Sequence, residues 1–284
     1  MTTAPILRAA LAQMCSADTH AANIATVTRL AEQAAGEGAD LLALPEVAGL
    51  MNRNAVVAQT QVVAAQDDPF IAACRDLAAR FGLWVHTGST PVRGPDGRFL
   101  NHSTLIDAAG RIVADYDKIH LFDVTLDGQA PIGESKRFAP GTHGVLAETP
   151  WGIFGLSICY DMRFAYLYRA YAQAGAVVMF APSAFTVPTG RAHWDVLLRA
   201  RAIETGAFML AAAQAGDHAD GRQTYGHALA VSPWGEVLAD LGTAAPAVQV
   251  VDLDIGAVAR ARAQIPAWGI APPDKLDLRH CKMP

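Results

Sequence analysis

Apolar and polar positions along residues 6–89 follow two alternating patterns. Residues 6–14 and 40–44 are nearly continuous apolar runs, which predicts buried strands, whereas residues 20–37 repeat apolar side chains at helical spacing. A second helix is predicted over residues 68–81 and a further strand over residues 83–89. This order of strand, helix and strand favours the α/β class.

From Pro91 onward the pattern changes to short strands joined by turns. Residues 99–107 and 111–116 flank an Ala-Ala-Gly turn and predict a β-hairpin, so the sheets are expected to be mixed. Residues 118–140 show no periodicity, and a loop of this length is usually functional or disordered. The other predicted elements are strands at 143–149, 152–158, 176–181, 207–213, 228–232, 237–240 and 248–253, and helices at 164–174, 192–204 and 255–264.

Composition excludes several classes of partner. The 284-residue chain is 52% hydrophobic, with a mean hydropathy of +0.20 and a net charge of −5, so it can form a large core but offers no basic face for nucleic acid. No apolar run reaches the roughly 20 residues of a membrane span, and no signal-peptide pattern precedes the first strand. We therefore expect residues 1–284 to form a single domain of a cytoplasmic protein.

The four cysteines are too scattered for a zinc site or a disulfide framework. We expect free thiols, with Cys15 and Cys74 filling the core and Cys281 in a terminal tail. Cys159 differs, because it stands where an apolar strand changes into a charged, helix-like stretch. A nucleophile at such a turn is lifted from the sheet edge, and the N–H groups that follow it face an oxyanion.

Two charged residues are placed like partners of such a nucleophile. Glu46 follows the carboxyl end of a buried strand, where α/β proteins bind ligands, and Lys118 begins the long loop. Plainer explanations exist, since a glutamate at a strand end is often a helix cap and a buried cysteine is often a core filler. A histidine base is also open, because spacing alone does not decide among His120, His193 and His227.

Three blocks of the sequence resemble the catalytic blocks of the nitrilase, or carbon-nitrogen hydrolase, superfamily. They are Leu-Pro-Glu at 44–46, Tyr-Asp-Lys-Ile-His-Leu-Phe-Asp at 116–123 and Cys-Tyr-Asp-Met-Arg-Phe at 159–164, in matching order and spacing. Together with the alternation of strands and helices, the resemblance implies an α/β fold, a four-layer α-β-β-α sandwich with two mixed β-sheets. It further implies a homodimer that needs no metal and no organic cofactor.

The resemblance also implies roles for individual residues. The backbone N–H of Tyr160 is expected to face the oxyanion, and Arg163 to meet either a substrate carboxylate or a structural ion-pair partner. The implied catalytic residues are the nucleophile Cys159, the general base Glu46, the oxyanion-stabilising Lys118, and Glu134, which orients the lysine.

Further segments resemble the branch of the superfamily that contains deaminated glutathione amidase. They are Pro-Ser-Ala-Phe-Thr at 182–186, residues 190–204, Ala-Ala-Ala-Gln-Ala-Gly at 211–216 and Tyr-Gly-His at 225–227. The implied substrate is a small amide with carboxylate groups, deaminated glutathione, cleaved through a thioester to 2-oxoglutarate and Cys-Gly. An ω-amidase acting on α-ketoglutaramate, a carbamoylase, a nitrilase and a catalytically silent scaffold stay open. Residues 268–280 depart from the branch, which leaves the dimer contacts open.

Overall fold

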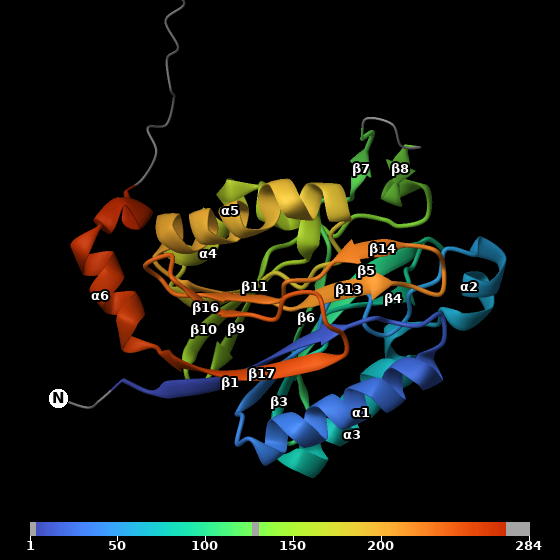
Figure 1. Ribbon diagram of the computed structural model, residues 1–284, viewed down its shortest axis with the longest axis horizontal. Helices are drawn as coiled ribbons and strands as arrows, with labels where there is room; N and C mark the ends of the chain where they lie inside the picture. Colours follow the sequence, from blue (N-terminus) through green and yellow to red (C-terminus); the bar gives the residue numbers. More distant parts are fainter. Residues whose placement is uncertain (1–3, 127–130, 271–284) are drawn as a thin grey trace, which may run out of the picture.

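Two β-sheets stack face to face between outer helices (Figure 1). The structure is a computed structural model that describes residues 4–126 and 131–270. Cys281 and most of the divergent segment 268–280 lie outside the described residues, so what we expect of them stays a prediction.

The first sheet has nine strands of mixed direction. Its strand β1 (Ile6–Met14) is parallel to β2 (Leu41–Ala43) and β13 (Ala213–Asp217) and antiparallel to β17 (Ala247–Asp254). Strand β3 (Trp84–His86) continues the parallel part beside β2. The remaining strands are β4 (Thr90–Arg93), β5 (Phe99–Ile106), β6 (Ile112–Asp117) and β14 (Gln223–Tyr225). Strands β5 and β6 confirm the predicted hairpin.

The second sheet has six strands and is also mixed. Its three central strands run parallel, and the neighbours on either side are antiparallel to them. The strands, in chain order, are β9 (Val145–Thr149), β10 (Gly152–Leu156), β11 (Ala176–Phe180), β12 (Phe208–Ala211), β15 (Leu229–Val231) and β16 (Val237–Asp240).

Helices cover the outer face of each sheet (Figure 1). The first sheet carries α1 (His20–Gly36) and α3 (Pro69–Phe81), and the second carries α4 (Ala165–Gln173) and α5 (Val187–Thr205). The predicted α-β-β-α sandwich is therefore confirmed. Helix α6 (Gly256–Gln264) follows β17 and lies at one end of the sandwich.

The apolar pattern of β1 explains why the fold has four layers. Alternate side chains of a strand point to opposite faces of its sheet. Leu7, Ala9 and Leu11 belong to the core between the two sheets, whereas Ala10 and Ala12 pack into a second core beneath α1 and α3. Both faces of the strand are buried, so its sequence reads as a continuous apolar run.

Helix α3 shows how local sequence sets an element's limits. The side chain of Asp68 accepts hydrogen bonds from the N–H groups of Phe70 and Ile71, both at 2.9 Å, and so caps the first turn. Pro69 occupies the first helical position, where its missing N–H costs nothing. Gly82, at a φ of 65°, ends the helix in the left-handed conformation that glycine adopts most easily.

The structure corrects the predicted strand at 207–213. The chain leaves the second sheet after Ala211 and enters the first at Ala213, so this apolar run contains the ends of two strands in different sheets. Because both strands are buried at this point, no polar residue in the sequence marks where the chain passes from one sheet to the other. The sequence analysis also missed β4, β14 and the short helix α2 (Ala55–Gln61), and α5 begins five residues before the predicted 192.

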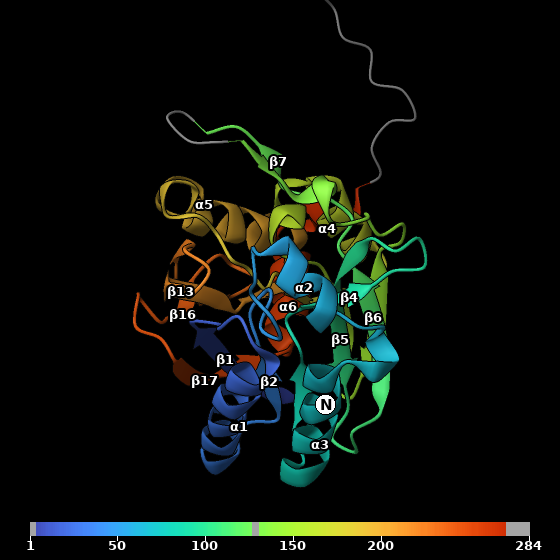
Figure 2. The same cartoon turned by 90° about the vertical axis from the view of Figure 1, so that its right-hand side faces the viewer.

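The loop predicted at 118–140 contains short regular elements. Strands β7 (Asp123–Val124) and β8 (Ile132–Gly133) pair antiparallel, and a single 3₁₀ turn (Glu134–Lys136) follows. Figure 2 shows this hairpin and α2 at the end of the sandwich that faces the viewer. That end holds the candidate site.

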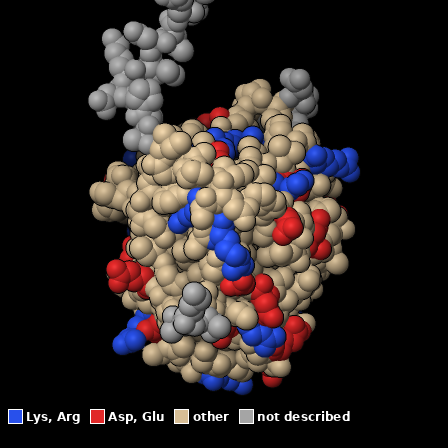
Figure 3. All heavy atoms as spheres, turned by 90° about the vertical axis from the view of Figure 1, so that its left-hand side faces the viewer, with Lys and Arg blue, Asp and Glu red and all other residues tan. Residues whose placement is uncertain are grey.

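The surface charge and the length of the helices bear on possible contacts with nucleic acid and membranes. On the face drawn in Figure 3, acidic and basic side chains are interspersed among other residues, and its described part shows no continuous basic area. Among residues 4–126 and 131–270, no helix combines the length and apolarity required to cross a bilayer.

Candidate active site

The turn that presents Glu46 is tightly constrained. It follows β2, and Val47 adopts a φ of 51°, a left-handed conformation that is costly for a β-branched residue. The Val47 N–H donates to Oγ of Ser89 at 2.8 Å, which holds this geometry. Gly88, at a φ of 65°, passes so close that a Cβ there would lie 2.0 Å from the carbonyl oxygen of Pro45. The carboxylate of Glu46 is therefore fixed at the carboxyl end of the strand, as predicted.

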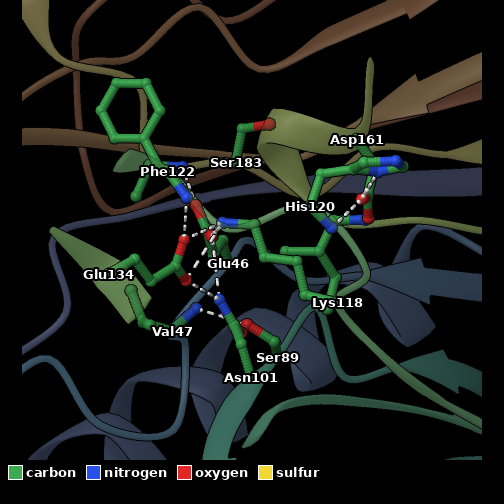
Figure 4. A network of polar contacts seen from close by, with 12 residues as sticks. Glu46, Val47, Ser89, Asn101, Lys118, His120, Phe122, Glu134, Asp161 and Ser183 are labelled. Atoms are coloured by element: carbon green, nitrogen blue, oxygen red, sulfur yellow. Dashed lines mark hydrogen bonds and ion pairs between the residues drawn. The ribbon is translucent and has the colours of Figure 1, made fainter. Parts of the chain in front are cut away.

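Lys118 lies between the carboxylates of Glu46 and Glu134 (Figure 4). Its Nζ is 2.8 Å from Oε1 of Glu46 and 2.9 Å from Oε2 of Glu134. The lysine follows β6, and Glu134 lies at the start of the 3₁₀ turn after β8, where it also accepts from the N–H of Phe122 at 2.7 Å. Only 2% of the lysine side chain is exposed. The structure thus brings three of the predicted site residues together.

Two neutral groups hold these carboxylates in place. The side-chain amide of Asn101, on β5, donates to Oε1 of Glu46 at 3.0 Å and to Oε1 of Glu134 at 3.2 Å. The backbone N–H of Ala184 donates to Oε2 of Glu46 at 2.9 Å. Both oxygens of Glu46 therefore have fixed partners, which limits the orientation of the carboxylate.

Cys159 stands at the predicted strand-to-helix turn. It is the first residue of a 3₁₀ turn (Cys159–Arg163) that follows β10, and its φ of 50° places it in the left-handed region. The buried carboxylate of Asp161 holds this turn by accepting from the N–H of Ile158 at 2.8 Å and from the hydroxyl of Tyr116 at 2.6 Å. Asp161 also contacts Nδ1 of His120 at 2.6 Å. One carboxylate thus ties the cysteine turn to the end of β6 and the start of the loop beyond it.

The charges around Cys159 favour a protonated thiol next to a charged lysine. Burial, reinforced by the negative charge of Glu46, raises the pKa of Cys159 well above its ordinary value, although Lys118 opposes this rise. Burial alone would lower the pKa of Lys118, but Glu134 and Glu46 outweigh it, and the lysine pKa is raised well above its ordinary value. A thiol in this setting needs a base before it can act as a nucleophile.

Cys159, Glu46, Lys118 and Glu134 all line one cavity of about 240 Å³. Aromatic residues form part of its wall: Phe122, Phe138, Tyr160 and Phe185. Among the described residues, no group of three or more His, Cys, Asp or Glu side chains is arranged to hold a metal ion. The cavity combines a nucleophile, carboxylates and a buried cation, which suits acyl transfer to a thiol.

Comparison with known proteins agrees with this geometry. The model of the carbon-nitrogen hydrolase family matches residues 8–263. This chain belongs to the carbon-nitrogen hydrolase family. It therefore hydrolyses carbon–nitrogen bonds other than peptide bonds, and its expected substrate is a small amide.

A relative from Yersinia enterocolitica, named deaminated glutathione amidase, is 39% identical over 245 residues, which cover 85% of each chain. The NitFhit protein of C. elegans, whose crystal structure is known, is 33% identical in sequence and superposes with a TM-score of 0.86. The match covers 94% of this hydrolase but only 65% of the NitFhit chain. A second solved structure is a mutant amidase from Nesterenkonia sp. AN1 with acrylamide added at its active-site cysteine. It is 27% identical in sequence, and the match has a TM-score of 0.75 and covers 92% of this hydrolase and 98% of that chain. These similarities agree with the α-β-β-α fold and with an active site that contains a cysteine.

The three candidate histidines of the hydrolase lie outside the cavity wall. His120 is held by Asp161, Nδ1 of His193 is 3.2 Å from a guanidinium nitrogen of Arg163, and Nδ1 of His227 is 2.9 Å from Asp240. None of these contacts involves Cys159. The geometry therefore favours Glu46 over a histidine as the base.

The two predicted substrate-binding residues are placed differently. Tyr160 lines the cavity, and its backbone N–H has no hydrogen-bond acceptor among the described residues, so it is available to an oxyanion. Arg163 does not line the cavity, and its guanidinium lies 5.8 Å from the ring centre of Tyr160 and 5.6 Å from that of Phe185. The role of Arg163 with a substrate carboxylate stays a prediction.

Sequence reasoning missed five residues at the site of the hydrolase. Asp161 lies inside the block 159–164 that resembles the family, and Arg137 follows Glu134 by three residues, yet neither stretch of sequence identified the contacts of these side chains. Asn101 is one of four consecutive polar residues in β5, so its place in the strand did not single it out. Arg53 and Arg222 also line the cavity, but both lie in polar loop segments that gave no signal.

Proposed function

We propose that this hydrolase cleaves a linear amide through a thioester on Cys159. The single observation that carries the proposal is the meeting of Cys159, Glu46, Lys118 and Glu134 in one cavity. In the first step, Glu46 takes the thiol proton while sulfur attacks the amide carbonyl carbon. Lys118 and the N–H of Tyr160 stabilise the negative charge that develops on the carbonyl oxygen.

The second half of the reaction uses the same groups. Protonated Glu46 gives its proton to the amide nitrogen as the carbon–nitrogen bond breaks, and the amine leaves. Water then attacks the thioester carbonyl and loses a proton to Glu46. The carbon–sulfur bond breaks, the proton returns from Glu46 to the thiolate, and the acid is released. Glu134 keeps Lys118 oriented throughout, through the contact of 2.9 Å.

We assign deaminated glutathione as the substrate, with 2-oxoglutarate and Cys-Gly as the products. The name of the Yersinia enterocolitica relative supports this assignment, and so do the segments at 182–186 and 211–216. The proposal includes three further features: a single domain over residues 1–284, assembly as a homodimer and a cytoplasmic location. Light scattering of the purified protein tests the dimer.

Steady-state hydrolysis of deaminated glutathione beside α-ketoglutaramate tests the proposal. Both amides release 2-oxoglutarate, so one coupled assay follows both reactions. We expect a kcat/KM at least about 100-fold higher for deaminated glutathione, a preference of the size that contacts to a second polar group supply. Cys159→Ala is expected to be inactive, whereas Cys15→Ala, a change at a free cysteine that is exposed and does not fill the core as predicted, keeps activity.

The possible results test the substrate, the mechanism and the presence of activity separately. A preference for α-ketoglutaramate keeps the thioester mechanism and replaces the substrate by that of an ω-amidase. An active Cys159→Ala protein refutes the mechanism. A wild-type protein that cleaves neither compound, nor any nitrile or N-carbamoyl amine, supports a scaffold.

A further inference from the structure

Three arginines line the catalytic cavity in addition to Lys118. Arg53 lies in the loop before α2, Arg137 directly follows the 3₁₀ turn that begins at Glu134, and Arg222 precedes β14. They come from three separate parts of the chain, and only the folded protein brings them to one cavity. Such a concentration of guanidinium groups suits a planar, negatively charged ligand group.

Among the described residues, a carboxylate pairs with only one of these three arginines. Arg222 is paired with Asp220, at 2.6 Å. The guanidinium of Arg137 donates only to backbone carbonyls, at 3.1 Å to that of Asn52 and 3.4 Å to that of Arg53. Among residues 4–126 and 131–270, no hydrogen bond or ion pair involves the guanidinium of Arg53. The catalytic carboxylates are already engaged with Lys118.

The pKa shifts of Arg53 and Arg137 agree with an excess of positive charge around these side chains. Burial lowers the pKa of Arg53 and of Arg137, and the positive charge of Arg222 lowers both further. Asp220 offsets this effect only in part, since both pKa values stay below the ordinary value. Arg53 and Arg137 remain charged at neutral pH, because an arginine pKa lies far above 7 even when it is lowered. A bound anion would relieve their mutual repulsion.

The position of the arginines shows which part of a substrate they can reach. Arg53 and Arg222, with Ile132 and Thr186, line both the catalytic cavity and an adjoining hollow. That hollow continues over β13 and β14, away from the catalytic residues, and none of Cys159, Glu46, Lys118 and Glu134 lines it. Arg53 and Arg222 therefore stand where a long substrate would leave the catalytic cavity, and Arg137 lines the cavity itself.

We propose that Arg53, Arg137 and Arg222 bind a carboxylate on the amine part of the amide, and so select substrates with a long, acidic leaving group. This inference rests on the proposed function and deepens it. An amide that releases ammonia has no group to place beyond the arginines, whereas a dipeptide-sized amine reaches them. The catalytic cavity then holds the acyl part and the scissile bond.

Arg53→Gln gives the cleanest test, because it leaves no described carboxylate without its partner. Three amides are compared: deaminated glutathione, the same compound with its glycine carboxylate converted to a carboxamide, and α-ketoglutaramate. For deaminated glutathione we expect kcat/KM to fall about 10- to 100-fold, mostly through KM, the scale of a lost hydrogen bond between charged groups. The other two amides should change by about threefold or less, as for an exposed charge.

Two variants serve as controls. Arg222→Lys keeps the charge but loses the planar fork, and it should give a smaller loss with the same dependence on the carboxylate. Arg98→Gln removes an exposed arginine that pairs with Asp96 outside the cavity, and it should leave all three amides unaffected. Equal losses on all three amides with Arg53→Gln, or no loss on any of them, overturn the inference.

A binding measurement separates this inference from the proposed function. Calorimetry with the Cys159→Ala protein gives the affinity for deaminated glutathione with and without the Arg53→Gln change. A 10- to 100-fold weaker affinity, about the effect expected above, supports the arginine site even if turnover shows another preferred substrate. Equal affinities refute the site, whatever the wild-type protein hydrolyses.

Discussion

The exchange of Glu46 for glutamine probes the base directly. Glutamine has nearly the same shape, so its oxygen can still accept from Lys118 and Asn101, at the sites now 2.8 and 3.0 Å away. Its amide nitrogen would then face the N–H of Ala184, which places two donors opposite each other where a bond of 2.9 Å exists now. We expect this mismatch to cost about 1 to 3 kcal/mol of folding free energy. The protein should therefore fold with a lower melting temperature.

Activity should fall far more than stability. An amide group cannot take the thiol proton, and loss of a general base costs about 10²- to 10⁴-fold in kcat, or roughly 3 to 5 kcal/mol of activation free energy. The reactivity of Cys159 toward iodoacetamide should change in the opposite direction. Because the charge of Glu46 raises the thiol pKa and Lys118 lowers it, removing the carboxylate should shift the alkylation profile to lower pH.

Peptide mapping by mass spectrometry follows alkylation at Cys159 alone, while the amide assay follows turnover. Glu134→Gln is the matched comparison, because Glu134 contacts Lys118, whereas the carboxylate that raises the pKa of Cys159 is that of Glu46. That variant should lose activity without the large shift in the alkylation profile. Near-normal turnover by Glu46→Gln together with an inactive His120→Ala or His193→Ala protein would refute the reasoning and restore a histidine base.

Three further changes test the surroundings of the site. Lys118→Met should cost about 3 to 5 kcal/mol of stability and lower kcat at least about 100-fold, because it leaves two buried carboxylates without their cation. Asp161→Asn should lower both the melting temperature and kcat, since its carboxylate accepts from Tyr116 and from Ile158. Burial lowers the pKa of His86 to about 3, so the folded protein binds fewer protons than the unfolded chain below about pH 6.5. The stability of the wild type should fall as pH decreases from about 6.5 toward 3, by up to about 1.4 kcal/mol per unit, and His86→Gln should flatten this dependence in urea titrations.

For each of these three predictions, a specific result would contradict the expected role of the residue. A Lys118→Met protein with normal turnover would show that the oxyanion needs no buried cation. An Asp161→Asn protein with a lower melting temperature but full activity would show that this carboxylate stabilises the fold and is not needed for turnover. An unchanged pH dependence in His86→Gln would assign the acid sensitivity to other groups.

The positions of Glu46 and Cys159 could be predicted from the sequence because each follows a buried strand. Strand recognition depends on local apolar pattern, and the end of such a strand is where the chain can turn and present a side chain. The left-handed conformations at Val47 and Cys159 could not be predicted in the same way, since neither residue type favours them. Tertiary contacts stabilise both turns, through Ser89 for the first and Asp161 for the second.

The change of sheet between β12 and β13 shows a second limit. Residues 207–213 are apolar on either side of the crossing because both strands are buried. A local pattern reports burial, but it does not report which sheet provides it. The pairing of Ala213 with Gln13 depends on contacts between parts of the chain some 200 residues apart, as does the bond of Gln214 to Ser16 at 2.7 Å.

Arg163 and Arg53 together show why specificity was harder to predict than chemistry. Arg163 stands in the same block as Cys159, yet the 3₁₀ turn directs its guanidinium toward Tyr160, Phe185 and His193. Arg53 has no neighbouring signal in the sequence, yet it lines the cavity. In the proposed mechanism the reaction depends on groups fixed near strand ends, whereas the proposed selection of the substrate depends on loops that meet only in the folded chain. Exchange of arginines in those loops should therefore change which amide is preferred while leaving the thioester chemistry intact.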